Sequence, residues 1–112
     1  MISTHVLDTA TGRPAVGVGV ILERQGAGGE LKQVSRARTD ADGRVRELIP
    51  GASDLEAGTY RLTFETGAYF ETLEAEGFYP RVSVLFTVRD PGQHYHVPLL
   101  LSAYGYSTYR GS

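Results

Sequence analysis

Apolar and polar residues alternate along several short segments of the chain, as in β-strands that bury one face. The clearest segment is 59–66, where Tyr60, Leu62 and Phe64 share a face. In 81–88, three valines and a phenylalanine form a second such face. Other segments of strand composition, separated by turn residues, are 3–8, 16–24, 31–39, 44–48 and 94–101. The pattern therefore predicts seven or eight short strands.

One segment, 68–77, has helical composition, since alanine, leucine and glutamate are frequent and Gly77 is placed to end a helix. The turn residues favour hairpins: DADG at 40–43 has Asp first and Gly fourth, and Pro50-Gly51 predicts a break in the chain. Short strands at hairpin spacing with one short helix predict an all-β sandwich. With 112 residues and no internal boundary or repeat, we expect a single domain, 1–112.

The segment 94–101 has two different faces. One face carries Tyr95, Val97, Leu99 and Leu101, and the other carries His94, His96, Pro98 and Leu100. Because the first set is the better core face, both histidines should point away from the interior. In 3–8 the same alternation places His5 and Leu7 opposite Thr4 and Val6. An outward face that combines histidine with leucine suggests a surface covered by another copy of the chain.

Composition narrows the classes of function. The formal net charge is −2, which argues against a nucleic-acid or anionic-membrane binder. Cysteine is absent, so there is no disulfide or thiolate metal site. No apolar stretch approaches the ~20 residues of a membrane span. The start, MISTHVLD, lacks the features of a signal peptide, so a native Met1 would predict a cytoplasmic protein.

All three histidines lie in the two strands with this face pattern. Each alone could be an ordinary surface residue. Together, His94, His96 and the distant His5 have the ligand types of a zinc site, although no HExxH motif accompanies them. Alternatively, a histidine with an unperturbed pKa near 6.5 can activate water and then protonate a leaving nitrogen without a metal. The residue pattern leaves these three interpretations open.

Other polar residues also have two interpretations. Arg44 follows the DADG turn and is either a solvated cation or a planar donor for an anionic or carbonyl-rich substrate. Tyr109 and Ser112 lie in a tail of the kind that usually frays. A serine nucleophile is not expected, since the sequence has no GxSxG motif.

Three blocks of the chain resemble the signatures of a known family. STHVLDTATGRPA, TDADGR and HYHVPLLLSAYGYSTYRGS look like those of the 5-hydroxyisourate hydrolases, the enzyme branch of the transthyretin-like family. The segment YFETLEAEGFYPRVSVLFTV is similar to the family's helix-then-strand region, so the resemblance runs nearly end to end. The terminal YRGS distinguishes the hydrolases from the carriers. Two small departures are Ala103 in place of a usual proline and Asp40 in place of a common asparagine.

The resemblance implies a transthyretin-like sandwich of two four-stranded sheets with one short helix. It implies a homotetramer, a dimer of dimers, with active sites at the dimer–dimer interface. The implied reaction is hydrolysis of 5-hydroxyisourate to 2-oxo-4-hydroxy-4-carboxy-5-ureidoimidazoline, with no cofactor or metal. The family's catalytic residues match His5, Arg44, His96 and Ser112, and substrate binding would also involve Tyr109, Arg110 and Gly111. The alternative is a non-catalytic carrier that binds an aromatic ligand in the tetramer channel; in such carriers the matched histidines and arginine are replaced.

Overall fold

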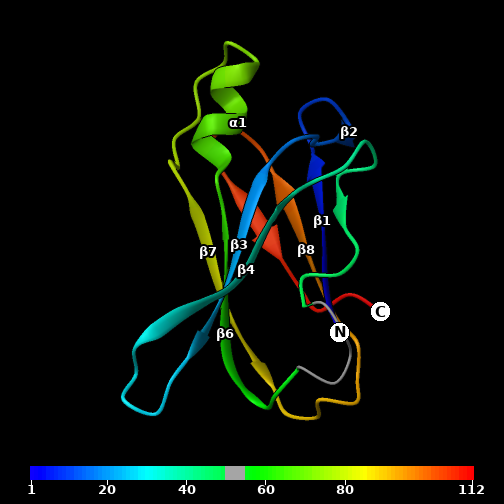
Figure 1. Cartoon of the computed structure of the whole chain (residues 1–112). Helices are drawn as coiled ribbons and strands as arrows, with labels where there is room; N and C mark the ends of the chain where they lie inside the picture. Colours follow the sequence, from blue (N-terminus) through cyan, green and yellow to red (C-terminus); the bar gives the residue numbers. More distant parts are fainter. Residues whose placement is uncertain (50–54) are drawn as a thin grey trace.

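A computed structural model describes residues 1–49 and 55–112, which form two facing β-sheets and one helix (Figure 1). The helix is α1 (Thr66–Thr72). The strands are β1 (Ile2–Asp8), β2 (Arg13–Pro14), β3 (Gly19–Gln25), β4 (Leu31–Arg38), β5 (Arg44–Val45), β6 (Gly58–Phe64), β7 (Val82–Val88), β8 (Tyr95–Leu101) and β9 (Tyr106–Thr108). The predicted break at Pro50-Gly51 lies outside the described residues.

The two sheets have different strand orders. One sheet has the order β2-β1-β8-β9, and β5 also pairs with β1. The second sheet has the order β4-β3-β6-β7 and is antiparallel throughout. The predicted all-β sandwich with one short helix is confirmed. The first sheet has five strands where the resemblance implied four, because the two-residue strands β2 and β5 both pair with β1.

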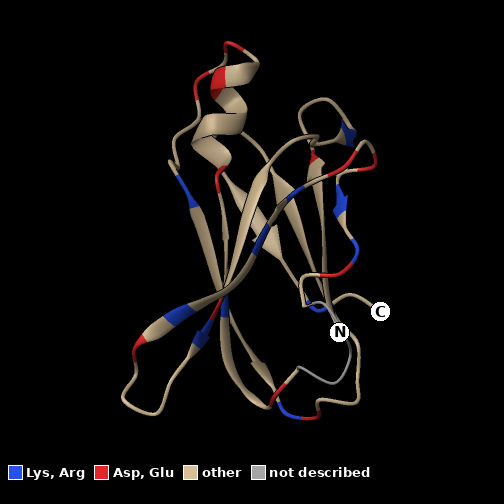
Figure 2. Ribbon diagram, in the orientation of Figure 1, with Lys and Arg blue, Asp and Glu red and all other residues tan. Residues whose placement is uncertain are grey.

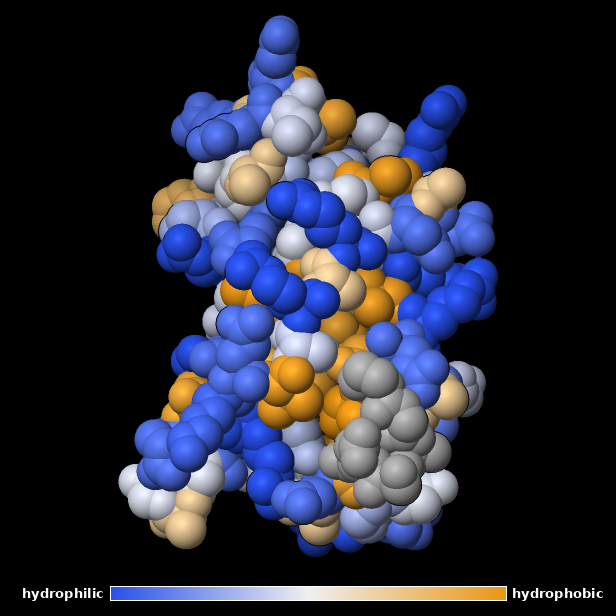
Figure 3. All heavy atoms as spheres, viewed as in Figure 1, coloured by the Kyte–Doolittle hydropathy of each residue, from blue (hydrophilic) through white to orange (hydrophobic). Residues whose placement is uncertain are grey.

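The core lies between the sheets and follows the predicted alternation. Tyr60, Leu62 and Phe64 of β6 are buried, and Tyr95 and Leu99 of β8 are buried opposite them in the other sheet. Burial of side chains of this size stabilises the fold by about 1.5–3 kcal/mol each. Polar side chains cover most of the face seen in Figure 3, and apolar atoms show between them in its middle.

The helix is shorter than the prediction of 68–77. It begins at Thr66 and ends at Thr72, and its buried residues are Thr66, Tyr69 and Phe70. Glu74, not Gly77, adopts the left-handed conformation that ends it, with φ 54°. Backbone bonds from Glu74 to Glu71 and from Ala75 to Phe70 complete this C-terminal motif. Gly77 instead packs against the Phe70 ring, which leaves no room for a Cβ at this position. The composition therefore indicated the helix, but packing determined its end.

Two predicted strands are also shorter in the structure. The segment 16–24 becomes a strand only from Gly19, because Gly17 takes a left-handed turn with φ 78°. The segment 44–48 pairs only over Arg44–Val45, and the following Leu48 is buried in the core without being part of a strand.

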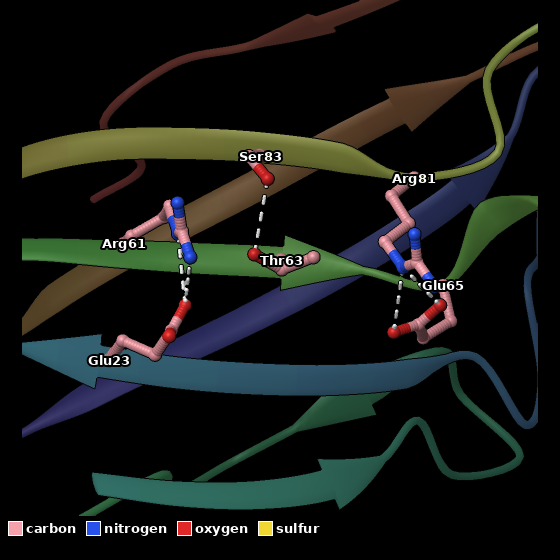
Figure 4. Close-up of polar contacts among 6 residues, drawn as sticks. All are labelled: Glu23, Arg61, Thr63, Glu65, Arg81 and Ser83. Atoms are coloured by element: carbon pink, nitrogen blue, oxygen red, sulfur yellow. Dashed lines mark hydrogen bonds and ion pairs between the residues drawn. The ribbon is translucent and has the colours of Figure 1, made fainter. Parts of the chain in front are cut away.

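Charged residues mark the surface of the second sheet. Its edge strand β4 carries Lys32, Arg36 and Arg38 (Figure 2), and such charges discourage pairing with other chains. Two polar cross-strand contacts, Glu23–Arg61 and Thr63–Ser83, lie on the outer face of β3, β6 and β7. A third, Glu65–Arg81, joins the residue after β6 to the residue before β7 (Figure 4). No helix in the described part of the chain is long and apolar enough to cross a membrane.

Candidate active site

The site is built around β1, whose two neighbours bring distant residues together. In the parallel pairing with β8, Ser3 lies opposite His96. In the antiparallel pairing with β5, His5 lies opposite Arg44. Ser3 and His5 are two residues apart on one strand, so they project to the same face of the sheet. Strands β1, β5 and β8 therefore meet here, and the two chain ends lie close to each other (Figure 1).

The predicted turn at 40–43 fixes the start of β5 and hence Arg44. The Asp40 carboxylate accepts hydrogen bonds from the backbone amides of Asp42 (2.8 Å) and Arg44 (3.0 Å). The bond from the Arg44 amide is the main reason that the pKa of Asp40 is lowered. Gly43 has φ 73°, and a Cβ there would lie 2.6 Å from the Val6 carbonyl oxygen. Only glycine fits this position, so the DGR sequence places Arg44 beside β1.

These elements enclose a cleft of about 170 Å³. Three of the predicted catalytic residues line this cleft: Arg44, His96 and Ser112. The remaining lining residues are Ser3, Thr4, Val45, Arg46 and His94. His5 is half-buried and paired with Arg44, but it is not a lining residue of the cleft in a single chain.

His96 is held in a defined orientation and environment. Its Nδ1 atom is 2.8 Å from Oγ of Ser3. Burial lowers the pKa of His96, and the Arg44 guanidinium and the rings of His94 and His5 lower it further. The imidazole is therefore largely neutral near pH 7, which is the form that can act as a base.

The residues of the terminal tetrapeptide lie in two different places beside β8. The Gly111 amide donates a 2.7 Å hydrogen bond to the His96 carbonyl oxygen, and Ser112 reaches the cleft. Tyr109 and Arg110 instead line a separate groove beside β7. The Arg110 guanidinium lies 4.5 Å from the centre of the Tyr95 ring and donates to Gln93 Oε1 at 3.0 Å. These contacts anchor the tail, and they give no support to substrate contact by Tyr109 and Arg110 within one chain.

Of the cleft residues that were not predicted, Ser3 and His94 are the two that contact the ring network of His96. Ser3 Oγ also lies 2.8 Å from His94 Nε2, so the serine joins both histidines of the HYH motif. The alternation did place Ser3 on the face of His5 and His94 on the face of His96. The missing information was the parallel pairing of the first and last long strands, which no local pattern shows.

The described residues favour neither a metal site nor a second catalytic cleft. Within 1–49 and 55–112, no three His, Asp or Glu side chains are arranged to hold one metal ion, and His94 and His96 are both bonded to Ser3. A larger cavity of about 500 Å³ lies between β4 and α1 and contains none of the predicted site residues. Its one carboxylate, Glu65, is paired with Arg81.

The fold and cleft together define a transthyretin-like β-sandwich with a histidine–arginine site of the type used for acid–base hydrolysis. The family model of the HIUase/Transthyretin family matches residues 2–111, and the chain belongs to this family. The 5-hydroxyisourate hydrolase of Salmonella dublin is 47% identical over 112 residues, which cover 100% of this chain and 81% of that protein.

Solved structures agree with this assignment. The Klebsiella pneumoniae 5-hydroxyisourate hydrolase has a TM-score of 0.86 and 40% identity, covering 99% of this chain and 97% of its own. Sea bream transthyretin in complex with thyroxine has a TM-score of 0.92 and 31% identity, covering 98% and 93%. The fold is thus shared by the hydrolase and by transthyretin, and the identity is higher to the hydrolase.

Proposed function

We propose that the protein is a 5-hydroxyisourate hydrolase, acting in urate degradation. Water attacks a ring carbonyl of the substrate and the cyclic amide C–N bond opens, giving 2-oxo-4-hydroxy-4-carboxy-5-ureidoimidazoline. The observation that carries the proposal is the cleft in which His96, Arg44 and Ser112 meet, in a chain 47% identical along its full length to a hydrolase of that name.

We assign the roles from the chemistry of each group. His96, with its lowered pKa, removes a proton from the attacking water, and His5 shares proton transfer from across the site. Arg44 offers a fixed, charged donor that stabilises the oxyanion as it forms on the carbonyl oxygen. Ser112, through its hydroxyl or terminal carboxylate, and the backbone of Gly111 hold substrate and water in line. Tyr109 and Arg110 support this arrangement by anchoring the tail.

We also propose a homotetramer, a dimer of dimers. Both sheets end in an edge strand without a partner in the described chain, β7 in one and β9 in the other. Exposed apolar side chains accompany these edges, with Leu85 on β7, Tyr106 on β9 and Tyr109 just after it. Unpaired edges with apolar side chains are surfaces that a second copy can cover. Sedimentation of the purified protein tests this proposal, and a monomer at catalytic concentrations would contradict it. The cytoplasm is the proposed location.

The activity is tested by generating 5-hydroxyisourate with urate oxidase and following its ultraviolet absorbance. We expect the protein to accelerate the decay in proportion to its concentration. Decay at the spontaneous rate, with a folded protein present, would exclude the hydrolase and leave the carrier of an aromatic ligand as the remaining proposal. The similarity to sea bream transthyretin is the observation that keeps this second candidate.

A chelator distinguishes the proposed metal-free hydrolase from a zinc hydrolase that would use the three histidines as ligands. We expect full activity after dialysis against EDTA, because Ser3 rather than a shared metal position joins His94 and His96. Activity that is lost on dialysis and restored by zinc would reverse this conclusion.

A further inference from the structure

Ser3 forms a bridge between the two histidines of β8. Its Oγ atom is 2.8 Å from His94 Nε2 and 2.8 Å from His96 Nδ1. Ser3 is only 5% exposed, so this hydroxyl is shielded from bulk water. The two imidazole rings are tilted by 53° with centroids 6.3 Å apart, so they do not stack, and the serine is their connection.

Because a hydroxyl has one proton to donate and can also accept, a chain in which Ser3 accepts from one imidazole and donates to the other can run in two directions. In the first direction, His96 Nδ1–H donates to Ser3 and the Ser3 hydroxyl donates to His94 Nε2. The Nε2 atom of His96 then carries a lone pair and is a base. In the opposite direction, His94 donates to Ser3 and Ser3 donates to His96 Nδ1. His96 then carries its proton on Nε2 and is an acid.

We propose that Ser3 and His94 are positioning residues for His96, with Ser3 fixing its ring and His94 accepting the proton that Ser3 passes on when His96 takes a proton from water. The inference rests on the proposed hydrolase activity and extends it. In the first step, the water O–H bond breaks, its oxygen bonds to the carbonyl carbon and its proton moves to His96 Nε2. The Nδ1 proton of His96 passes to Ser3, and the Ser3 proton passes to His94, which becomes the imidazolium.

The second step returns the proton by the same route. As the C–N bond breaks, His96 Nε2–H protonates the leaving nitrogen. Ser3 gives its proton to His96 Nδ1 and receives one from His94 Nε2, which restores the starting state. The net result is that the proton of water reaches the leaving nitrogen. One histidine thereby serves as base and then as acid without carrying a positive charge beside Arg44.

The charges around the ring favour this path. His96 faces Arg44 and Arg46 from the β5 side, His5 from β1 and the Ser112 end of the chain in the cleft. Burial and then the Arg44 guanidinium disfavour a charged His96, whereas the His94 side chain is exposed to solvent. The extra proton is therefore expected to reside on His94 between the two steps.

Variants of the full-length protein test this inference in the ultraviolet assay. We expect Ser3→Ala to lower kcat about tenfold or more with KM within about twofold, because the ring loses its orientation while the binding groups remain. Ser3→Thr keeps a hydroxyl and should restore most of kcat. The matched control is Ser83→Ala, which removes a serine–threonine bond on the outer face of the second sheet (Figure 4) and should leave kcat unchanged.

His94→Gln isolates the role of the proton. Its side-chain amide can still bond to Ser3 but cannot accept a proton, so kcat should fall and should rise again with the concentration of added imidazole buffer. Nitrogen-15 NMR should show His96 protonated on Nδ1 in the wild type and a mixture of tautomers in Ser3→Ala. An active wild type whose Ser3→Ala and His94→Gln variants keep its kcat would overturn the relay alone. A wild type without activity would overturn the hydrolase and the relay together.

Discussion

The backbone amide of Gly111 bonds to the His96 carbonyl oxygen at 2.7 Å, and a Cβ on Gly111 would lie only 2.6 Å from Cδ2 of the His96 ring. The penultimate residue of the chain is thus in direct contact with the histidine that we assign as the base. Because of this contact, the tail and the ring cannot shift independently.

A Gly111→Ala variant should lose activity while remaining folded. The added methyl group must displace either the His96 ring or the Ser112 end, and a misplacement of about 1 Å can cost about 100-fold in rate. We expect kcat to fall at least about tenfold, with little change in Tm. Gly105→Ala is the control, because its Cβ would meet nothing closer than Ser102 Oγ at 3.7 Å. Equal kcat in the two variants would show that the contact does not matter.

Arg44→Ala and His96→Ala should each lower the rate of ring opening at least about 100-fold, as expected for loss of an oxyanion donor or a proton-transfer group. Circular dichroism should show both variants folded, since neither side chain is part of the buried core. Arg81→Ala is the matched control, because it removes an exposed arginine from the outer face of the second sheet. A loss below about tenfold in either variant would remove that residue from the mechanism.

The lowered pKa of His96 has a measurable sign. An NMR titration should give a midpoint below 6.5, and Arg44→Gln should raise it, because the guanidinium is the second cause of the shift after burial. The unfolded chain then binds a proton first as the pH falls. The contribution of His96 to the free energy of unfolding is therefore fully present above about pH 6.5. It declines as the pH falls through the lowered pKa of His96 in the folded state. A midpoint at or above 6.5 would contradict the assignment of His96 as a base that is neutral near pH 7.

Deleting Ser112 should affect turnover more than stability. The residue is exposed and lines the cleft, and a terminal residue contributes few packed contacts. We expect a clear fall in kcat at unchanged Tm. A deletion that lowers Tm without first slowing the reaction would indicate that the chain end has a structural role only.

The sequence predicted the features that depend on neighbouring residues. Alternation placed Tyr60 and Leu99 in the core and His5 and His96 on outward faces, because successive side chains in a strand project to opposite sides. The DADG turn was predicted for the same local reason and is confirmed; the structure adds the bond from the Arg44 amide to Asp40 and the left-handed conformation of Gly43.

Features that depend on long-range pairing could not be predicted. The Ser3–His96 contact arises because β1 pairs in parallel with β8, and 93 positions along the chain separate the two residues. Nothing in the STHVLD segment itself indicates that its serine will meet two imidazoles. The end of α1 was also missed, since Glu74 rather than a glycine adopts the left-handed conformation there.

A buried hydrogen bond between Tyr69 and Asp8 connects the helix to the end of β1, and it should contribute to stability rather than catalysis. The Tyr69 hydroxyl donates to Asp8 Oδ2 at 2.9 Å, and the Ala10 amide donates to Oδ1 at 3.0 Å. Asp8 is 2% exposed, and no salt bridge within residues 1–49 and 55–112 includes it. Burial and the nearby carboxylate raise the pKa of Tyr69 to about 12, so the phenol remains a donor at every pH of practical use.

Tyr69→Phe should therefore lower the free energy of unfolding by about 1.5–3 kcal/mol, the usual range for a hydrogen bond to a charged group. The loss arises because the buried Asp8 side chain loses a hydrogen-bond donor. Urea denaturation measures the change, and Tyr104→Phe is the matched control because Tyr104 is exposed. Since Tyr69 lies outside the cleft, kcat per folded molecule should not change. A variant as stable as the wild type would mean that water replaces the phenol at Asp8, and a variant with normal stability but reduced kcat would place the helix in the mechanism.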